Sequence, residues 1–351
     1  MNTDYKKICS APLFFERNRV ARVYTGGLLF HDFFGDPAED GHKPEEWIAS
    51  SVQALNKDGQ EDDGYSFIEG TDIRLDRLIE TCPKEILGDR KELGVLVKIL
   101  DSAVRLPIQA HPDKAFSRKY FSSDYGKTEA WLILKTRPNA KICFGFKDEI
   151  TVEEFKDAVR RSETDKNAMN PYLNELEAKE GDVYLIPARA VHAIGYGCLI
   201  LEVQEPTDFT IQPEAWCDEY RLNDYEMYLG LDPDVALSCF DFSICGPDAP
   251  NLSIKKPVLL YEKGGVKAEE LIGPTDTDCF GLIRYGIHGG ALPLTHASAI
   301  YIVTSGEGTV SGEEMNRAVN QGDYFMLPAA AQNRYTIEGK LTLVACLPPR
   351  K

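Results

Sequence analysis

One segment of the chain occurs twice, and this repeat constrains the fold more than any other feature of the sequence. Residues 180–194 read EGDVYLIPARAVHAI and residues 321–335 read QGDYFMLPAAAQNRY, so both copies match the pattern G-D-x-x-x-[IL]-P-A. Each copy is preceded by strand-like sequence and followed by another strand-like run, CLILEVQ in one case and LTLVACL in the other. Self-similarity of this kind predicts two related β-units in one chain.

Most other segments alternate apolar and polar residues over short runs between Gly, Pro and Asp, which is typical of the strands of a sandwich or barrel. A Gly-Asp turn that leads into a strand ending at proline, with a ligand-type residue five positions later, resembles the second motif of the cupin fold, a small double-sheet jelly roll. We therefore expect a mainly β chain with two cupin-like jelly-roll β-sandwich domains.

Three segments in the N-terminal half have helical spacing of their apolar residues, and we expect helical insertions there. Residues 76–100 are interrupted by Pro83, residues 151–176 open with the capping-box pattern of Thr151 before Glu154, and residues 218–229 stop before Gly230. The turn-rich run FDFSICGPDAPN follows the last of them. We expect a metal-binding catalytic domain over residues 1–240 and a second sandwich without a metal site over residues 241–351.

Composition excludes several classes of partner. The 351 residues carry a formal net charge of -17, which repels nucleic acid and anionic lipid surfaces. Nowhere do enough apolar residues run together to span a bilayer, and the first residues lack the pattern of an export signal. The 9 cysteines are odd in number and never spaced as CxxC, which favours a reducing compartment. We expect a cytoplasmic protein that binds neither nucleic acid nor membrane.

Four side chains from distant segments form a candidate metal site. Gln109 and His111 are two residues apart in LPIQAHPDK, so in a strand they project from the same face. Glu129 begins a predicted strand, and His192 stands in the first repeat where the second has Asn333. Two imidazoles, a carboxylate and an amide oxygen suit zinc, and only the first sandwich offers them. Spacing alone also leaves open a structural, hydrogen-bonded role for each histidine.

The ordered motifs Q-A-H-P-D-K, G-K-T-E-A-W, P-A-x-x-V-H-A-I-G and L-E-V-Q followed by T-D resemble those of the short bacterial type I mannose-6-phosphate isomerases, over roughly residues 95–210. The resemblance implies a zinc-dependent aldose-ketose isomerase that converts mannose 6-phosphate to fructose 6-phosphate through an enediol. It also implies that Gln109, His111, Glu129 and His192 bind one zinc ion per chain.

Further active-site positions follow from the same resemblance. Lys98 and Lys127 match active-site lysines of the family, Glu202 matches an active-site glutamate, and Asp208 matches the aspartate of its S-D segment. We expect catalytic roles for Lys127, Glu202 and Gln212, and substrate-binding roles for Lys98, Asp208 and Arg189. Between residues 98 and 141 there are nine Lys and Arg against four acids, which is compatible with an anionic sugar phosphate as the substrate.

At three positions the sequence departs from the family pattern, and these departures leave the identity of the substrate open. Gln212 stands where the segment S-D-x-T-x-R has an arginine, Pro107 replaces the serine of L-S-I-Q, and residues 24–27 read YTGG where many members have W-G-G. A neutral amide cannot stabilise a developing anion as a guanidinium does, so we expect Arg189 or Arg221 to compensate. The departures keep two alternatives open: a family member that isomerises another sugar or sugar phosphate, or a non-catalytic zinc-containing sugar-binding cupin.

Overall fold

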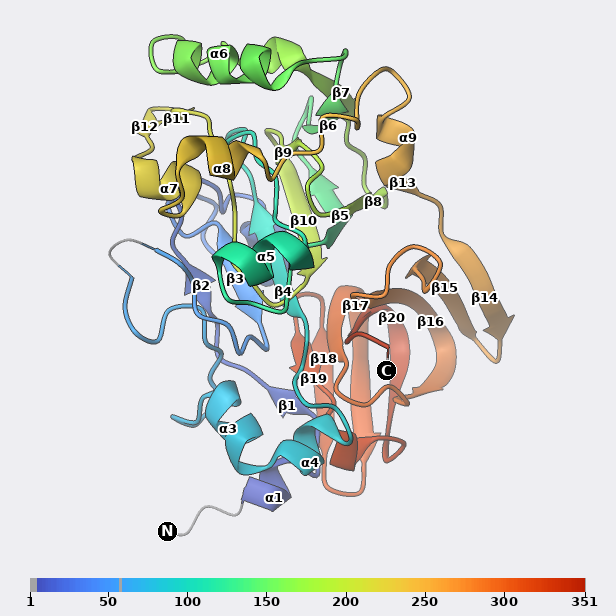
Figure 1. Ribbon diagram of the computed structural model, residues 1–351. Coiled ribbons are helices and arrows are strands. Elements are labelled where there is room, and N and C mark those ends of the chain that lie inside the picture. The colour runs from blue at the N-terminus through green and yellow to red at the C-terminus, as the bar shows by residue number, and fades with distance from the viewer. Residues whose placement is uncertain (1–4, 57–58, 351) are drawn as a thin grey trace.

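The computed structural model describes residues 5–56 and 59–350, and two large antiparallel sheets dominate it (Figure 1). The first sheet contains β2 (Arg19–Val20), β3 (Glu45–Ile48), β4 (Leu96–Asp101), β5 (Glu129–Thr136), β8 (Val183–Ile186), β10 (Cys198–Gln204) and β13 (Ile254–Lys255). The second contains β1 (Leu13–Phe14), β14 (Val258–Lys263), β15 (Val266–Ile272), β16 (Gly281–Pro293), β17 (Ile300–Gly312), β18 (Asn316–Asn320), β19 (Tyr324–Met326) and β20 (Tyr335–Leu347). Their strand orders are β13-β8-β5-β10-β4-β3-β2 and β1-β19-β17-β20-β16-β15-β14, with β18 paired to β17.

Two smaller sheets and the helices complete the fold. One small sheet has the order β7-β6-β9 and the other pairs two strands; their strands are β6 (Lys141–Phe146), β7 (Leu173–Glu177), β9 (His192–Ile194), β11 (Trp216–Cys217) and β12 (Tyr220–Arg221). The helices are α1 (Tyr5–Ile8), α2 (Phe30–Phe34), α3 (Leu75–Thr81), α4 (Pro83–Leu87), α5 (Lys114–Tyr120), α6 (Val152–Ser162), α7 (Asp224–Tyr228), α8 (Pro233–Leu237), α9 (Pro250–Ser253) and the short 3₁₀ turns η1 (Asn170–Tyr172) and η2 (Ala329–Ala331). In Figure 1, α6, α7 and α8 lie at the end of the molecule away from the second sheet. The predicted mainly β fold with helical insertions ahead of the second sandwich is confirmed.

The first sheet is buried on both faces, which explains its nearly continuous apolar strands. Along β10, Leu199, Leu201 and Val203 enter a core that also contains Ile302 and Val344 of the second sheet. The alternate residues of β10 face the opposite way, toward a core under the helices and the small sheets. Full burial of one such leucine is worth roughly 1.5–3 kcal/mol, so the shared core holds the two large sheets together.

The two copies of the sequence repeat adopt the same turn. Gly181 and Gly322 have φ values of 88° and 89°, a left-handed conformation that glycine adopts without steric cost. The carboxylate of Asp182 accepts a hydrogen bond from the amide three residues before it at 3.0 Å, and that of Asp323 does the same at 2.7 Å. The turns lead into β8 and β19, so the repeat marks equivalent strands in the two large sheets.

The helix predictions are partly right. Residues 76–100 contain α3 and α4, which meet at Pro83, but residues 96–100 form β4 because both faces of that strand are buried in the sheet. The capping box of α6 is confirmed: Thr151 Oγ1 accepts from Glu154 N at 3.2 Å, and Glu154 Oε2 accepts from Thr151 N at 2.8 Å. That helix ends earlier than predicted, and β7 follows. Residues 218–229 contain only α7, because the start of the segment pairs in β12.

Each large sheet takes one short strand from the other half of the chain. The early strand β1 pairs with β19 of the second sheet, and β13 pairs with β8 of the first. The proposed division between residues 240 and 241 therefore stays a prediction. All nine cysteines are free thiols, and eight of them are buried. Within residues 5–56 and 59–350, no helix has the length and apolar character needed to cross a bilayer.

Candidate metal centre and substrate pocket

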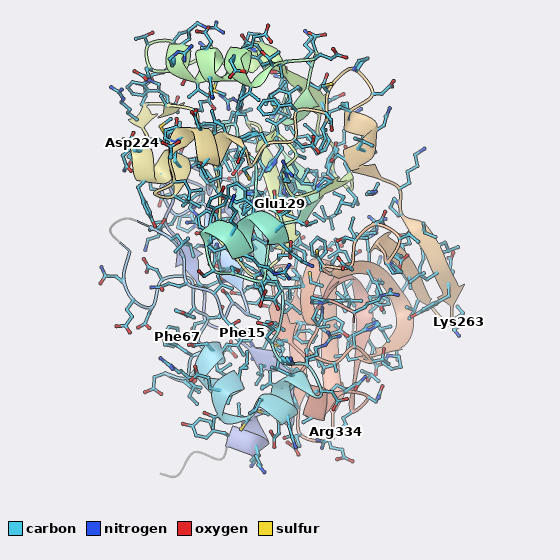
Figure 2. All side chains as sticks on the ribbon, in the orientation of Figure 1. Phe15, Phe67, Glu129, Asp224, Lys263 and Arg334 are labelled. Atoms are coloured by element: carbon cyan, nitrogen blue, oxygen red, sulfur yellow. The ribbon has the colours of Figure 1, made fainter. Side chains whose placement is uncertain are left out.

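Three neighbouring strands direct charged side chains into one pocket. Side chains alternate between the two faces of a strand. In these strands the intervening apolar residues enter the core shared with the second sheet. The opposite face carries Lys98 of β4, Glu129 of β5 and Glu202 of β10, which line the pocket. The register pairs Glu202 with Lys98 on one side and with Trp131 on the other. Figure 2 shows Glu129 in the interior of the N-terminal part of the molecule. Sheet register alone thus brings these charges together.

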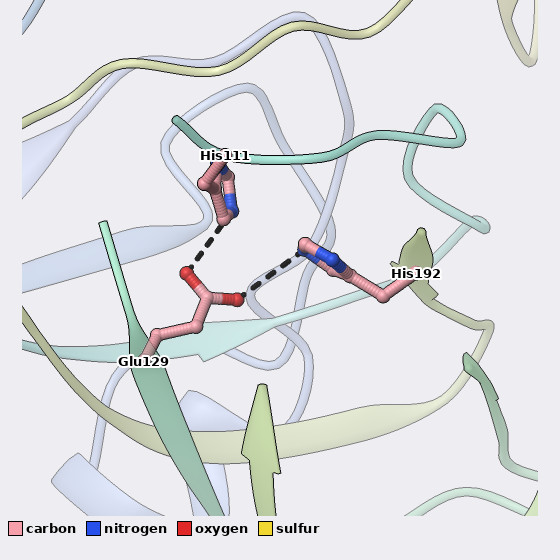
Figure 3. A group of neighbouring side chains, drawn as sticks. All are labelled: His111, Glu129 and His192. Atoms are coloured by element: carbon pink, nitrogen blue, oxygen red, sulfur yellow. Dashed lines mark ion pairs between the residues drawn. The ribbon is translucent and has the colours of Figure 1, made fainter. Parts of the chain in front are cut away.

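His111, Glu129 and His192 converge from three separate segments (Figure 3). The segment before His111 is bridged to β9, because Gln109 and His192 exchange backbone hydrogen bonds of 3.0 and 2.9 Å. His111 Nε2 lies 3.1 Å from Glu129 Oε2, and His192 Nε2 lies 3.4 Å from Glu129 Oε1. All three side chains are buried, and their ligand atoms lie within 4.8 Å of one another. The predicted convergence of these three residues is therefore present.

The backbone sets the protonation of both imidazoles. His111 Nδ1 lies 3.0 Å from the carbonyl oxygen of Phe209, and His192 Nδ1 lies 2.9 Å from that of Ala190. Because a carbonyl only accepts, each Nδ1 carries the proton and each Nε2 keeps its lone pair. Burial lowers the pKa of His111 to about 3 and also lowers the pKa of His192, so both rings are neutral near pH 7. Two lone pairs thus point at one carboxylate.

This cluster has the chemistry of a cation site. Glu129 Oε2 and His192 Nε2 are buried without a hydrogen-bond partner among the described residues. Burial opposes ionisation of Glu129, yet the positive charge of Lys127 and contact with His111 hold the pKa of this carboxyl well below its usual range. Trp131 Nε1 donates to Glu129 Oε1 at 3.1 Å and fixes its orientation. Two imidazole nitrogens and one carboxylate form an N/O donor set that fits a divalent metal such as zinc.

Gln109 and Lys127 line the same pocket. Gln109 is 7% exposed, and its amide oxygen is the fourth donor predicted from the sequence. Lys127 Nζ lies 3.0 Å from His111 Nε2 and 3.3 Å from Glu129 Oε2, so its ammonium offsets part of the negative charge at the cluster. The assignments of Gln109 as a ligand and of Lys127 as a catalytic residue stay predictions.

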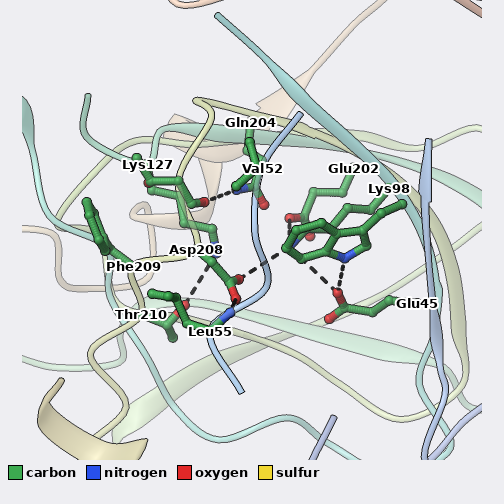
Figure 4. A network of polar contacts seen from close by, with 12 residues as sticks. Glu45, Val52, Leu55, Lys98, Lys127, Glu202, Gln204, Asp208, Phe209 and Thr210 are labelled. Carbon is green, nitrogen blue, oxygen red and sulfur yellow. Dashed lines mark hydrogen bonds and ion pairs between the residues drawn. The ribbon is translucent and has the colours of Figure 1, made fainter. Parts of the chain in front are cut away.

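A buried network of acids and bases adjoins the cluster (Figure 4). Lys98 Nζ lies 3.6 Å from Glu202, 3.7 Å from Glu45 and 3.9 Å from Asp208. Burial raises the pKa of Glu202 to about 7, and the negative charge of Glu129 adds to that shift. Glu202 Oε1 has no hydrogen-bond partner among the described residues. A carboxyl with this pKa can both accept and release a proton near neutral pH.

Sequence reasoning missed the residues that complete this network. Arg22 Nε lies 3.0 Å from Glu45, and Arg22 Nη2 lies 3.1 Å from both carboxylate oxygens of Asp208. Asn56 accepts from Arg22 Nη1 at 3.1 Å, and Tyr24 donates to Glu45 at 2.7 Å. All of these residues line the pocket. No motif marks them, apart from the YTGG segment that contains Tyr24, because their contacts join distant parts of the chain.

Comparison with known proteins agrees with this geometry, although no family model matches the chain. The chain is 28% identical over 334 residues to the probable mannose-6-phosphate isomerase GmuF of Bacillus subtilis (strain 168), covering 93% of this chain and 96% of GmuF. It is 25% identical over 345 residues to the mannose-6-phosphate isomerase of Streptococcus mutans serotype c, covering 95% and 97%. The solved mannose 6-phosphate isomerase of Bacillus subtilis has the same fold, with a TM-score of 0.76, 23% identity and coverage of 96% and 99%. The chain is thus similar, over nearly its whole length, to proteins named mannose-6-phosphate isomerase.

The positions at which the sequence departs from the motifs of the isomerases that it resembles lie in the pocket wall. Gln212 lines the pocket, and its Nε2 donates to the backbone oxygen of Glu226 at 3.0 Å. Pro107 lines it too and offers no side-chain hydrogen-bonding group. Tyr24 of the YTGG segment lines the pocket as well, so each of the three departures noted in the sequence has a residue at the pocket. Residue 212 is a glutamine and supplies no guanidinium, so any arginine side chain in the pocket wall has to come from another position.

Neither arginine that was expected to compensate lies in the wall of this pocket, as far as the described residues define it. Arg189 donates from Nε to the carbonyl of Cys239 and from Nη2 to that of Ser238, both at 3.3 Å. Arg221 is exposed in β12. A role for Arg189 in substrate binding thus stays a prediction that these contacts do not support. Among the residues that the structure describes, the arginine that lines the pocket is Arg22.

Proposed function

We propose that this protein is a zinc-dependent mannose-6-phosphate isomerase that interconverts mannose 6-phosphate and fructose 6-phosphate through an enediol. The observation that carries the proposal is the convergence of His111, Glu129 and His192 beside the buried carboxyl of Glu202. Relatives that match over nearly the whole chain are named mannose-6-phosphate isomerases, which supports this choice of substrate. Zinc, the enediol and the substrate are the parts of the proposal that need experiment.

In this proposal Gln109, His111, Glu129 and His192 hold one zinc ion. When bound, zinc supplies a Lewis acid that stabilises negative charge on the substrate oxygens at C1 and C2. The protein orients its own donors beforehand: the carbonyls of Phe209 and Ala190 hold the two imidazoles, and the indole of Trp131 holds Glu129. Such outer contacts keep the donor atoms in place and reduce reorganisation on binding.

Glu202 is the proposed proton carrier. Isomerisation moves a proton between two adjacent carbons, so the pocket needs one group that takes the proton from one carbon and returns it to the other. Glu202 has a pKa of about 7, and Oε1 of its carboxyl has no competing hydrogen bond among the described residues. Lys98, 3.6 Å away, stabilises the ionised form. The carboxylate form of Glu202 is the one that removes the proton.

The remaining pocket residues orient the substrate in this proposal. Lys98 and Asp208, which lie 3.9 Å apart, offer a donor and an acceptor to sugar hydroxyls. Lys127 and Gln212 line the pocket as further donors and are proposed to assist catalysis. The nine free thiols fit a reducing compartment, so we place the protein in the cytoplasm.

One observation favours a second candidate function. A neutral glutamine at residue 212 and a proline at residue 107 give the pocket wall less capacity for a phosphate, which favours isomerisation of a different sugar or sugar phosphate. A cupin that binds zinc and sugar without turnover is the third outcome to be tested.

A coupled assay on purified protein of known metal content separates these functions. Formation of fructose 6-phosphate from mannose 6-phosphate that stops on chelation and returns with zinc supports the proposal. Turnover of another sugar phosphate, with none of mannose 6-phosphate, supports the second candidate. Tight sugar binding without any turnover points to the non-catalytic cupin. Full activity of the metal-free protein would contradict all three candidate functions, because each of them assumes a bound zinc ion.

A further inference from the structure

A polar corner of the pocket contains a donor that the protein leaves unsatisfied. Asn56 Oδ1 accepts from Arg22 Nη1 at 3.1 Å, whereas Asn56 Nδ2 is buried and has no hydrogen-bond partner among the described residues. Both side chains line the pocket that contains the His-Glu-His cluster. A buried amide nitrogen without an acceptor is costly, so its position makes sense when a ligand supplies the acceptor.

Arg22 is held rigidly beside this nitrogen. Its Nε lies 3.0 Å from Glu45, its Nη2 lies 3.1 Å from both oxygens of Asp208, and its guanidinium lies 5.2 Å from the ring centre of Trp47. Glu45, Asp208 and Asn56 contact Nε, Nη2 and Nη1 of this guanidinium, so its orientation beside the Asn56 amide is fixed in advance. Each Nη of a guanidinium carries two N–H donors.

The two other cations of the pocket wall are committed to different partners. Lys98 is 3% exposed and lies between the carboxylates of Glu45, Glu202 and Asp208. Lys127 contacts His111 and Glu129 at the metal cluster. Arg22 is the more exposed cation, with 12% of its side chain accessible, so among the described residues it is the one best placed to meet an incoming anion.

We propose that Arg22 and Asn56 form an oxyanion subsite that binds the phosphoryl group of a sugar phosphate. The inference rests on the proposed function and identifies where the charged end of that substrate binds. A guanidinium fork and a neighbouring amide present directional N–H donors that match phosphoryl oxygens. Glu45 and Asp208 offset the charge of Arg22, so the subsite acts through oriented hydrogen bonds more than through net charge. Through Arg22 the subsite also supplies the pocket with a guanidinium, which Gln212 cannot supply.

The decisive variant is Asn56→Asp. The side chain keeps its size and the oxygen that accepts from Arg22, but the Nδ2 donor becomes an oxygen that repels phosphate. We expect the KM for mannose 6-phosphate to rise about tenfold or more, with kcat changed by no more than about threefold, because the reacting carbons are held elsewhere. Inhibition by inorganic phosphate should weaken by a similar factor. Asn316→Asp, at an exposed position of β18, is the matched control and should leave both constants unchanged.

Arg22→Lys is the second variant, since it keeps the charge but loses the fork; it should also raise KM and weaken inhibition by phosphate. Thermal unfolding of each variant checks that the fold is intact, and if Asn56→Asp does not fold, Arg22→Lys carries the test alone. Unchanged KM and unchanged phosphate inhibition in the folded variants would overturn the subsite while leaving the proposed function standing.

The subsite is also tested if the proposed function fails. Should the wild-type protein not turn over mannose 6-phosphate, calorimetric titration with inorganic phosphate replaces the kinetic assay. Binding to the wild type that is lost in Asn56→Asp supports the subsite and separates it from the failed function. Equal binding by both proteins, or no binding by the wild type, overturns it.

Discussion

The substitution Glu202→Gln tests the proposed proton carrier with the smallest change of shape. Glutamine keeps the volume of the buried side chain and its place in β10, but it can neither take a proton from carbon nor carry a charge. Lys98 loses its partner at 3.6 Å but keeps Glu45 at 3.7 Å and Asp208 at 3.9 Å. The variant should therefore fold, and loss of negative charge beside Glu129 should leave metal binding intact.

The expected magnitude follows from the role of a positioned base. General base catalysis contributes about 10²- to 10⁴-fold, so kcat should fall by that factor, which corresponds to about 3 to 5 kcal/mol of lost transition-state stabilisation. The KM for mannose 6-phosphate should change little, because Glu202 acts on the reacting carbon in the transition state. The unfolding free energy should change by no more than about 1–2 kcal/mol, because a raised pKa means that the fold disfavours the ionised carboxylate, so replacing it by a neutral amide removes no stabilising charge.

The pH dependence gives the sign of the effect. Because burial and Glu129 raise the pKa of Glu202 to about 7, the carboxyl becomes protonated as the pH falls through that value. Activity of the wild type should therefore decline on the acid side, with a midpoint at or below about 7, since a bound cation favours the ionised form. This acid limb should be absent from the residual activity of Glu202→Gln.

Formation of fructose 6-phosphate gives kcat and KM, and incorporation of solvent deuterium at C2 of the substrate follows proton removal directly. Metal content, measured on the same samples, shows whether the zinc site survives. Glu177→Gln, an exposed substitution on β7, is the control and should behave as the wild type. Retention of more than about a tenth of the wild-type kcat, with the acid limb unchanged, would refute a role for Glu202 as the base.

Three further predictions follow from the structure. Trp131→Phe removes the 3.1 Å hydrogen bond to Glu129 and should weaken zinc binding by about 10- to 100-fold in a chelator competition, whereas unchanged affinity would mean that this contact does not orient the ligand. Chelation should lower the midpoint of thermal unfolding, because zinc at 100 times its Kd stabilises the fold by about 2.7 kcal/mol; equal midpoints with and without zinc would argue against a native-state site. Gly26→Ala should cost about 3 kcal/mol or more in urea unfolding, because a Cβ at residue 26 would lie 1.8 Å from the carbonyl oxygen of Asp101; a small loss would show that the backbone can shift there.

The amino-acid sequence determined the features that depend on local pattern. The Gly-Asp turns of the repeat, the capping box of α6 and the strand over CLILEVQ each involve residues close together in the chain, and each appears in the structure where it was predicted. The three residues His111, Glu129 and His192 were also identified correctly as neighbours. Residue types with specific chemistry, in an order that resembles a known family, were enough to single them out before any coordinates.

Only the tertiary structure decided which other side chains share the pocket. Arg22 and Asp208 are 186 positions apart, and nothing in either segment indicates their contact. The same holds for Asn56, and for Arg189, whose guanidinium turns to the carbonyls of Ser238 and Cys239. Residues 96–100 lie in a segment predicted to be helical yet form a strand of the first large sheet, because both faces of that strand are buried: one in the core shared with the second large sheet, the other largely in the core under the helices and small sheets. Such outcomes depend on packing between distant segments, which local periodicity does not encode.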